Sequence, residues 1–170
     1  MAYSVNGIDI LPSCNFTYDG QSLSQYKHEG ILVWSKELML TTSLGTSVNT
    51  GDPYETCTNA SGAIDIPAGS FTKLKVTGTH GYTVHSGGTY GAHSNSYISL
   101  KINGQWVNEY AHLAGCSGYT NHLSASFSKE ITIDSRVTGV RLYIKVLREN
   151  IDYASQGNAY VKNVSILATG

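Results

Sequence analysis

Charged residues are scarce in this sequence. Lys, Arg, Asp and Glu make up 14% of its 170 residues, whereas an average domain has roughly 25%. The balance of 11 cations against 12 anions leaves a formal net charge of −1, so the chain lacks the basic surplus that a nucleic-acid-binding surface needs. With 41% hydrophobic residues, the chain is neither disordered nor a coiled coil. Its polarity comes from 20 Ser, 16 Thr and 11 Asn instead, which is typical of all-β surfaces that meet neutral polar ligands.

Long apolar runs are also missing. The longest ones, residues 30–34 and 140–147, are far shorter than the roughly 20 residues of a membrane-spanning helix. The first residues, MAYSVNGIDILPS, have no charged leader and no sustained apolar core, so we expect no signal peptide. We therefore expect no membrane insertion.

No spacing of cysteine and histidine matches a known metal site. Cys14, Cys57 and Cys116 are far apart, and we expect three reduced, partly buried thiols. Five histidines lie in or beside two Gly-rich segments: His80, His85, His93, His112 and His122. There is no HExxH and no Cys-His pair at finger spacing, so we expect solvated side chains and no bound metal. A calcium ion held by Asp52 or Asp65 is the alternative, although no EF-hand loop supports it.

Catalytic signatures are absent too. No GxSxG motif precedes a helix, and no Gly-rich phosphate loop follows a strand. A glycosidase needs two carboxylates about 5 to 10 Å apart, and nothing in the sequence brings any two of Glu109, Asp134 and Glu149 together. We therefore expect a protein without enzymatic activity and without a cofactor.

Hydrophobic residues alternate with polar ones along most of the chain, which predicts strands with one buried and one wet face. Five segments show the pattern: residues 71–77, 98–102, 127–133, 140–146 and 160–167. No segment keeps a helical spacing for three turns, and only residues 35–40 could form either a short helix or a strand. We predict an all-β protein folded as an antiparallel two-sheet β-sandwich resembling a jelly roll.

The sequence predicts three regions. Residues 1–45 hold two short apolar runs, which predict a small N-terminal β extension or assembly segment, too small to form its own core. Residues 46–62 are a turn-rich linker, and residues 63–170 form the sandwich. Within the sandwich, residues 79–96 carry four Gly and three His and read as either a ligand loop or an exposed connection.

Asn103-Gly104 between two alternating segments predicts a two-residue type I′ hairpin. Such a turn fixes the register of the two strands. The pairs that it predicts are Ile102 with Gln105, Lys101 with Trp106, Leu100 with Val107, Ser99 with Asn108, and Tyr97 with Tyr110. Ile98, Leu100, Ile102 and Val107 then share the core face.

The other face of this hairpin is the predicted site. Aromatic rings beside amides and hydroxyls suit a sugar, whose apolar face stacks while its hydroxyls form hydrogen bonds. The candidate ligand-binding residues are Trp106, Tyr97, Tyr110, Asn108, Ser99 and Lys101, with Tyr90 from the neighbouring loop. Two alternatives stay open: the face is covered by the N-terminal segment or by another subunit, or a longer turn breaks the register.

Two N-terminal stretches, residues 4–11 (SVNGIDIL) and 29–36 (EGILVWSK), resemble short motifs of tail-associated structural proteins of phages and prophages of Gram-positive bacteria. From Ala63 to Gly170, the strand order, with IPAGSFTKLKVTG, SYISLKINGQWV and VRLYIKV, is similar to the jelly-roll sandwiches of receptor-binding tail proteins and carbohydrate-binding modules.

This resemblance implies an oligomeric, non-enzymatic protein that attaches to a bacterial surface glycan. It would be located in the virion, as part of a phage tail, or in the bacterial cytoplasm before assembly. The alternative is a purely structural virion subunit that uses the aromatic face as its interface with copies of itself or with other tail proteins. A small carbohydrate-active enzyme is a third hypothesis.

Overall fold

A computed structural model describes the backbone of most of the chain. The described residues are 3–5, 8–10, 17–18, 21–22, 25–28, 31–35, 37–50, 56–66, 71–84, 93–116, 122–134, 136–147 and 157–170. Side chains are described within 37–49, 56–66, 71–83, 94–116, 123–134, 136–146 and 157–170. Among these residues there is no helix long and apolar enough to cross a membrane.

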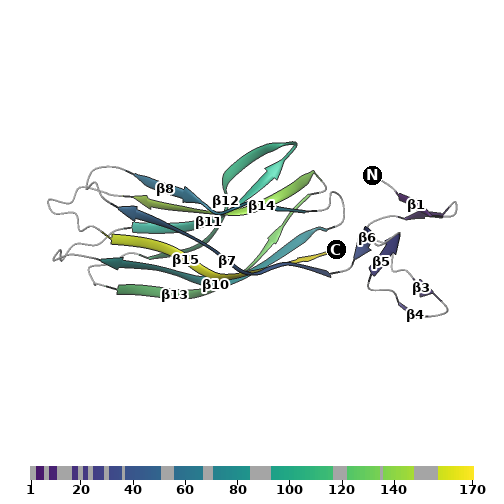
Figure 1. The fold of residues 1–170 in the computed structure, drawn as a ribbon, viewed down its shortest axis with the longest axis horizontal. Helices are drawn as coiled ribbons and strands as arrows, with labels where there is room; N and C mark the ends of the chain where they lie inside the picture. The colour runs from purple at the N-terminus through teal and green to yellow at the C-terminus, as the bar shows by residue number, and fades with distance from the viewer. Residues whose placement is uncertain are drawn as a thin grey trace.

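Two antiparallel sheets form a sandwich, as the alternation predicts (Figure 1). One sheet has four strands in the order β13 (His122–Thr132), β10 (Lys73–Val84), β15 (Gly157–Thr169) and β7 (Glu37–Thr50). The other has five: β12 (Gln105–Cys116), β11 (His93–Ile102), β14 (Val137–Leu147) and β8 (Cys57–Ala60), with β9 (Ile64–Asp65) also paired to β14. The predicted all-β two-sheet sandwich is confirmed.

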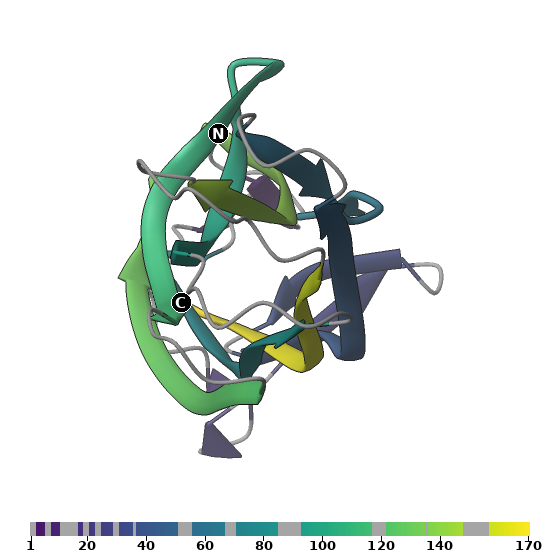
Figure 2. The ribbon, with the colours of Figure 1, turned by 90° about the vertical axis from the view of Figure 1, so that its left-hand side faces the viewer.

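The core lies between the two sheets, and both contribute aliphatic side chains to it. Seen along the long axis, the strands of the two sheets surround this shared interior (Figure 2). Side chains that are 0% exposed come from central strands of both sheets: Leu74, Val76, Ile98, Leu100, Val140, Leu142, Ile144, Val146, Val164 and Ile166. Burial of so many branched side chains is the main stabilising contribution to such a fold.

Two of the sandwich strands lie in the region that the sequence analysis assigned to the extension and the linker. β7 pairs with β15 along residues 37–50, and β8 pairs with β14 along residues 57–60. Residues 35–40, left open between helix and strand, contribute to β7 from Glu37 onward. Turn-forming residues mask the apolar alternation of these strands, which explains why the pattern alone did not find them. The division of the chain into domains stays a prediction.

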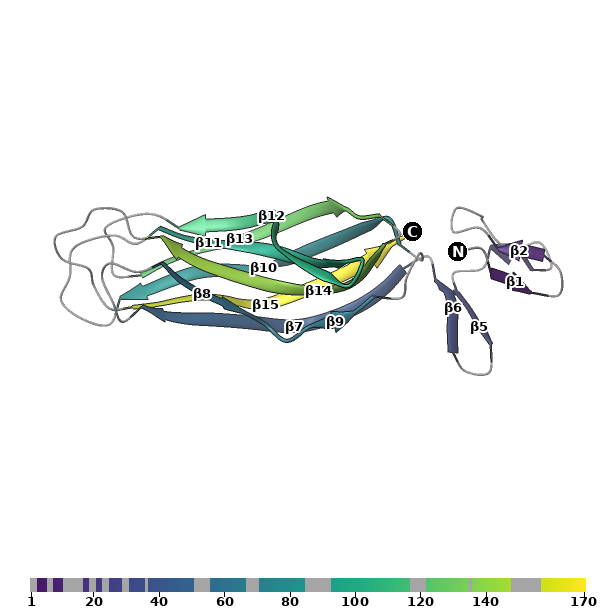
Figure 3. The same cartoon turned by 90° about the horizontal axis from the view of Figure 1, so that it is seen from above.

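The first 35 residues contain three small hairpins. They pair β1 (Tyr3–Val5) with β2 (Ile8–Ile10), β3 (Thr17–Tyr18) with β4 (Gln21–Ser22), and β5 (Gln25–His28) with β6 (Ile31–Ser35). Among the described residues, none of these hairpins joins either sheet of the sandwich. Figure 3 shows them beyond the end of the sandwich at which the C-terminus lies.

Candidate functional site

The hairpin between β11 and β12 has the predicted turn. Asn103 and Gly104 both have positive φ angles, 50° and 82°, as a type I′ turn requires. Next to the turn, Ile102 pairs with Gln105, Lys101 with Trp106, and Leu100 with Val107. The first three pairs of the predicted register are confirmed.

Beyond these pairs a bulge in β12 changes the register. Ile98 pairs with Ala111 and Tyr97 with His112, so the predicted pairing of Tyr97 with Tyr110 is wrong. The bulge leaves Ser99 opposite residues 108–110, in place of the predicted one-to-one pair with Asn108. Ser99 is buried, and its hydroxyl donates a hydrogen bond to the backbone carbonyl of Asn108 at 2.7 Å. Bulges bend a strand and redirect its side chains, and the alternation of a single strand does not reveal them.

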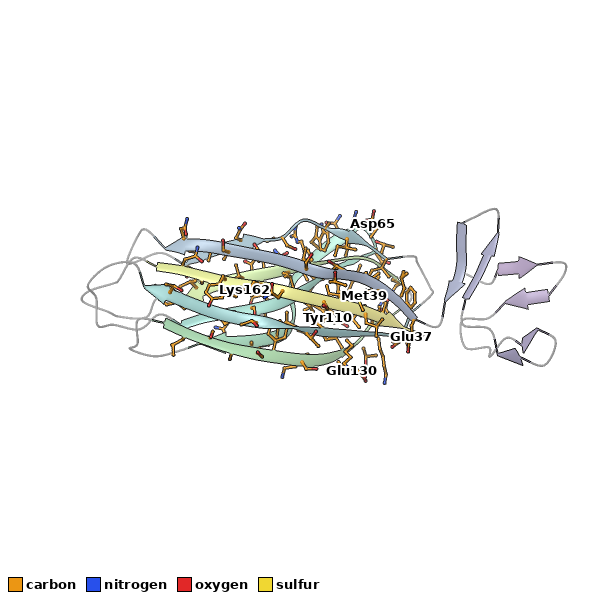
Figure 4. All side chains as sticks on the ribbon, turned by 60° about the horizontal axis from the view of Figure 1, so that its bottom comes forward. Glu37, Met39, Asp65, Tyr110, Glu130 and Lys162 are labelled. Carbon is orange, nitrogen blue, oxygen red and sulfur yellow. The ribbon has the colours of Figure 1, made fainter. Side chains whose placement is uncertain are left out.

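The bulge and the exposed end of the hairpin displace two of the predicted residues. Val107 lies on the same side as buried Leu100, but it is 43% exposed and therefore not part of the core as predicted. Tyr110 is 39% exposed, and its hydroxyl donates a hydrogen bond to the carbonyl of Thr132 in β13, at 3.2 Å. Tyr110 therefore connects the edges of the two sheets (Figure 4).

Trp106 lies on the outer face of the five-stranded sheet. A Cβ atom built on Gly139 of β14 would lie 3.5 Å from the indole Cη2 and 3.3 Å from Cβ of Lys101. The indole therefore reaches across β11 to the backbone of β14 and does not enter the core. We call this surface the Trp106 face. The residues whose side chains meet on it are Asn95, Tyr97, Lys101, Trp106, Asn108, Glu109, His112, Arg141, Tyr143 and Lys145.

Arg141 is the central cation of the Trp106 face. Its guanidinium carbon lies 4.2 Å from the centroid of the Trp106 ring, within the range of a cation–π contact. One terminal nitrogen, Nη2, donates a hydrogen bond to Oδ1 of Asn108 at 2.7 Å. The Nε atom is buried and has no hydrogen-bond partner in the part of the chain that the structure describes.

A second polar pair joins the same two strands. Nζ of Lys145 lies 2.9 Å from Oε1 of Glu109, and this hydrogen bond raises the pKa of Lys145. Glu109 is therefore paired with a cation, in contrast to the paired carboxylates of a glycosidase. Asp134 contacts Arg136 two residues further on, which lowers the pKa of Asp134. Glu149 lies outside the described residues.

Aromatic and imidazole rings fill the rest of the Trp106 face. The rings of Tyr97 and His112 meet edge to face, with centroids 5.4 Å apart, and Tyr143 lies 6.4 Å from Tyr97. Nε2 of His112 is 3.1 Å from Oδ1 of Asn95. These contacts fix the rings, because each side chain is bounded by a neighbour on the next strand.

The structure brings together only some of the predicted residues. Trp106, Tyr97, Asn108 and Lys101 belong to the Trp106 face, whereas Ser99 is buried and Tyr110 points to the other sheet. Tyr90 lies outside the described residues. Arg141, Tyr143 and Lys145 were not among the predicted residues, because the alternation predicted β14 as a strand without indicating that it pairs with β11. The alternation of Gly139, Arg141, Tyr143 and Lys145 was the available signal.

Histidines do not gather into a site in the described part of the chain, which holds no group of three or more His, Cys, Asp or Glu side chains able to bind a metal. His112 is exposed, whereas His80 is fully buried and so differs from the expected solvated side chain. Asp65 is exposed on β9. The remaining predicted ligands, namely Asp52, His85 and the side chains of His93 and His122, lie outside the described residues.

His80 links the two sheets inside the core. Its Nε2 lies 2.9 Å from the hydroxyl and 3.1 Å from the carbonyl oxygen of Ser94 in β11. Burial lowers the pKa of His80 to about 4, with the backbone of Ser94 opposing the shift and His112 adding to it. The ring is therefore neutral near pH 7, and His80 has a structural place in the core.

The sequence matches no protein-family model and no curated protein. Solved structures with a similar fold include particles of infectious bursal disease virus. Its Gx strain is 13% identical, with a TM-score of 0.47 over 93% of this chain and 40% of the viral chain. Its Gt strain is 14% identical, with the same TM-score over 95% and 42%. The VP2 subviral particle is 15% identical, with a TM-score of 0.40 over 92% and 45%.

This chain thus spans less than half the length of each of these viral chains. The likeness concerns the β-sandwich alone, and TM-scores below 0.5 support no conclusion about ligands, activity or assembly. The structures are viral particles rather than phage tails, so the phage-tail setting stays a prediction.

Proposed function

We propose that this chain is a non-enzymatic structural module of a virion-type assembly, and that the Trp106 face is its interface with a neighbouring copy. The observation that supports this most is the concentration of Trp106, Tyr97, Tyr143 and Arg141 on one face, where contacts with neighbours hold them in place. Trp, Tyr and Arg are the side chains that contribute most at the centres of protein interfaces.

The sheet edges support assembly through a face. β13 and β12 are edge strands. Lys129 of β13 pairs with buried Val76 and so stands on the inner side of an edge strand, where a charge opposes pairing with another strand. β12 is interrupted by the bulges near residue 99. Both features disfavour pairing of a second copy with these two edge strands.

Sedimentation velocity tests the interface. We expect the apparent mass of the wild-type protein to rise above the single-chain mass of 18.3 kDa as its concentration rises. Trp106→Ala should weaken this association, while Tyr160→Ala, an aromatic deletion on the outer face of the other sheet, should leave it unchanged. A wild-type chain that stays at 18.3 kDa at every concentration would contradict the proposed interface.

Carbohydrate recognition by the Trp106 face is the second candidate. The described large apolar side chains that are most exposed are Met39, Val107 and Tyr110, and none of them lies on this face. Its exposed groups are amide, guanidinium, ammonium and phenol groups around an indole, which suits the alternating apolar and hydroxyl surfaces of a sugar. A glycan array tests this candidate, and unchanged binding after Trp106→Ala would show that the sugar binds elsewhere.

A further inference from the structure

Two cations beside Trp106 form no ion pair with any residue that the structure describes. We propose that Arg141, Lys101 and Trp106 form a binding site for a carboxylate-bearing sugar, that is, for a uronic acid residue of an acidic polysaccharide. The proposal deepens the second candidate function and rests on it. An acidic sugar differs from the neutral ligand that the composition suggested. The reason is that the pairing of β14 with β11 brings the charge of Arg141 to this face.

The charges of the Trp106 face do not cancel. Of the cations on it, Lys145 is paired with Glu109. Neither Arg141 nor Lys101 has a carboxylate within ion-pair distance among the described residues, where the ion pairs involve other cations. Asp65, exposed on β9 and paired in register with Gly139, adds a second carboxylate at the margin of the face. Three cations then stand against two carboxylates, so the face keeps a local charge of +1, although the whole chain has a formal net charge of −1.

Both cations flank the same ring. Lys101 is directly opposite Trp106 in the register, and the guanidinium of Arg141 lies over the indole from the next strand. The indole covers one side of the guanidinium and so limits its hydration. An anion is favoured at such a place, because a charge-assisted hydrogen bond is about twice as strong as a neutral one.

The chemistry around these cations suits a sugar acid. The planar guanidinium can bind a carboxylate through two parallel hydrogen bonds. The exposed Asn108 adds an oxygen atom that can accept a hydrogen bond from a sugar hydroxyl.

Isothermal titration of the full chain tests the site. The probes are glucuronate and galacturonate oligosaccharides, their methyl esters as neutral controls, and a glycerol-phosphate polymer. We expect the wild-type chain to bind a uronate oligosaccharide about 10- to 100-fold more tightly than its methyl ester, as the loss of charged hydrogen bonds implies. High salt should reduce this preference.

Variants locate the preference. Arg141→Gln should abolish it, Arg141→Lys should retain part of it, and Lys101→Ala should reduce it several-fold. Lys162→Ala is the matched control, because Lys162 also lies over an aromatic ring, that of Tyr160 at 4.9 Å, on the other sheet. This control should bind as the wild type does. Thermal unfolding of each variant verifies that it is folded.

The outcomes separate the inference from the function on which it rests. Equal binding of the uronate and its ester would overturn the acidic site while leaving carbohydrate recognition intact. A preference that survives Arg141→Gln, or tighter binding of the glycerol-phosphate polymer, would also overturn it. Binding to none of the probes, with no hit on a glycan array, would remove both the site and the carbohydrate function.

Discussion

The outer faces of the two sheets are built on the same alternation but differ in chemistry. The four-stranded sheet presents mainly short hydroxyl side chains, such as Ser124, Ser126 and Ser128 of β13, together with the exposed ion pair of Lys73 and Glu130. Figure 4 views this sheet, with Met39, Lys162 and Glu130 on it and Asp65 at its margin on the other sheet. The Trp106 face instead carries an indole in contact with the guanidinium of Arg141, together with two phenols and an imidazole that lie beside one another.

Each face has one cation over one aromatic ring, and the comparison of the two pairs is instructive. Lys162 is exposed, and its ammonium can be hydrated beside Tyr160. Arg141 is half-buried, lies closer to its ring, and has a buried Nε. The cation–π contact on the four-stranded sheet is therefore solvated, whereas the one on the Trp106 face belongs to a set of side chains held in place by their neighbours.

The largest expected effect is common to both sheets, because they share one core. Leu74→Ala in β10 and Leu142→Ala in β14 each remove a side chain that is 0% exposed. Each should lower the free energy of unfolding by about 2–5 kcal/mol. Urea unfolding followed by circular dichroism and by tryptophan fluorescence should give one coincident transition for both variants. Two separate transitions would mean that the sheets unfold independently.

Acid should weaken the link between the two sheets. His80 has a pKa of about 4 in the folded chain and 6.5 as its ordinary value, so the unfolded chain binds the proton more tightly. Stability is then fully present above about pH 6.5 and falls as the pH drops towards 4, by up to about 3 kcal/mol.

The difference between wild type and His80→Gln isolates this contribution from that of the carboxylates. Its loss across the same pH range should be visible in urea titrations. His112→Gln removes only the smallest contribution to the lowered pKa of His80 and should leave most of the pH dependence in place. A pH dependence that persists unchanged in His80→Gln would contradict the assignment.

Replacing one glycine on each sheet should show how tightly the two outer faces are packed, with smaller effects than those above. A Cβ atom on Gly81 of β10 would lie 2.7 Å from the backbone carbonyl of Leu123 and would overlap the hydroxyl of Tyr160. On Gly139 its nearest neighbour would be Cβ of Lys101 at 3.3 Å. Gly81→Ala should therefore cost about 1–3 kcal/mol and Gly139→Ala less than about 1 kcal/mol. The reverse order in denaturant unfolding would show that the Trp106 face is packed more tightly than the structure indicates.

The sequence predicted the fold well because period-two alternation and the Asn103-Gly104 turn are local signals. The five segments with clear alternation became β10, β11, β13, β14 and β15. The site was predicted only in part. Trp106 was placed on the outer face correctly, because it belongs to the second residue pair from the turn.

Residues further from the turn were predicted less well. The bulge that turns the Tyr110 side chain towards the other sheet depends on how β12 bends at the sheet edge. The place of Arg141 on the Trp106 face depends on the pairing of β11 with β14, which are far apart in the sequence. The hydrophobic pattern within a single segment determines neither the bulge nor the strand pairing, so that pattern could not predict them.

The smallest effects should come from the exposed ion pairs. Lys73→Ala on the four-stranded sheet should change the midpoint of thermal unfolding by about as little as the error of the measurement, because both partners are solvated. Lys145→Ala should change it slightly more, since the Lys145 side chain is 26% exposed and that of Lys73 49%. An equal or larger effect at Lys73 would remove this distinction between the faces.

Hydroxyl-radical footprinting tests most directly whether the Trp106 face is the surface through which the chain makes contacts. Oxidation would be compared between dilute and concentrated protein, and with and without a uronate oligosaccharide. We predict that Trp106, Tyr97 and Tyr143 become protected from oxidation under at least one of these conditions, while Met39 and Tyr160 react at an unchanged rate. Protection of Met39 and Tyr160 instead, or no change at Trp106 under any condition, would contradict it.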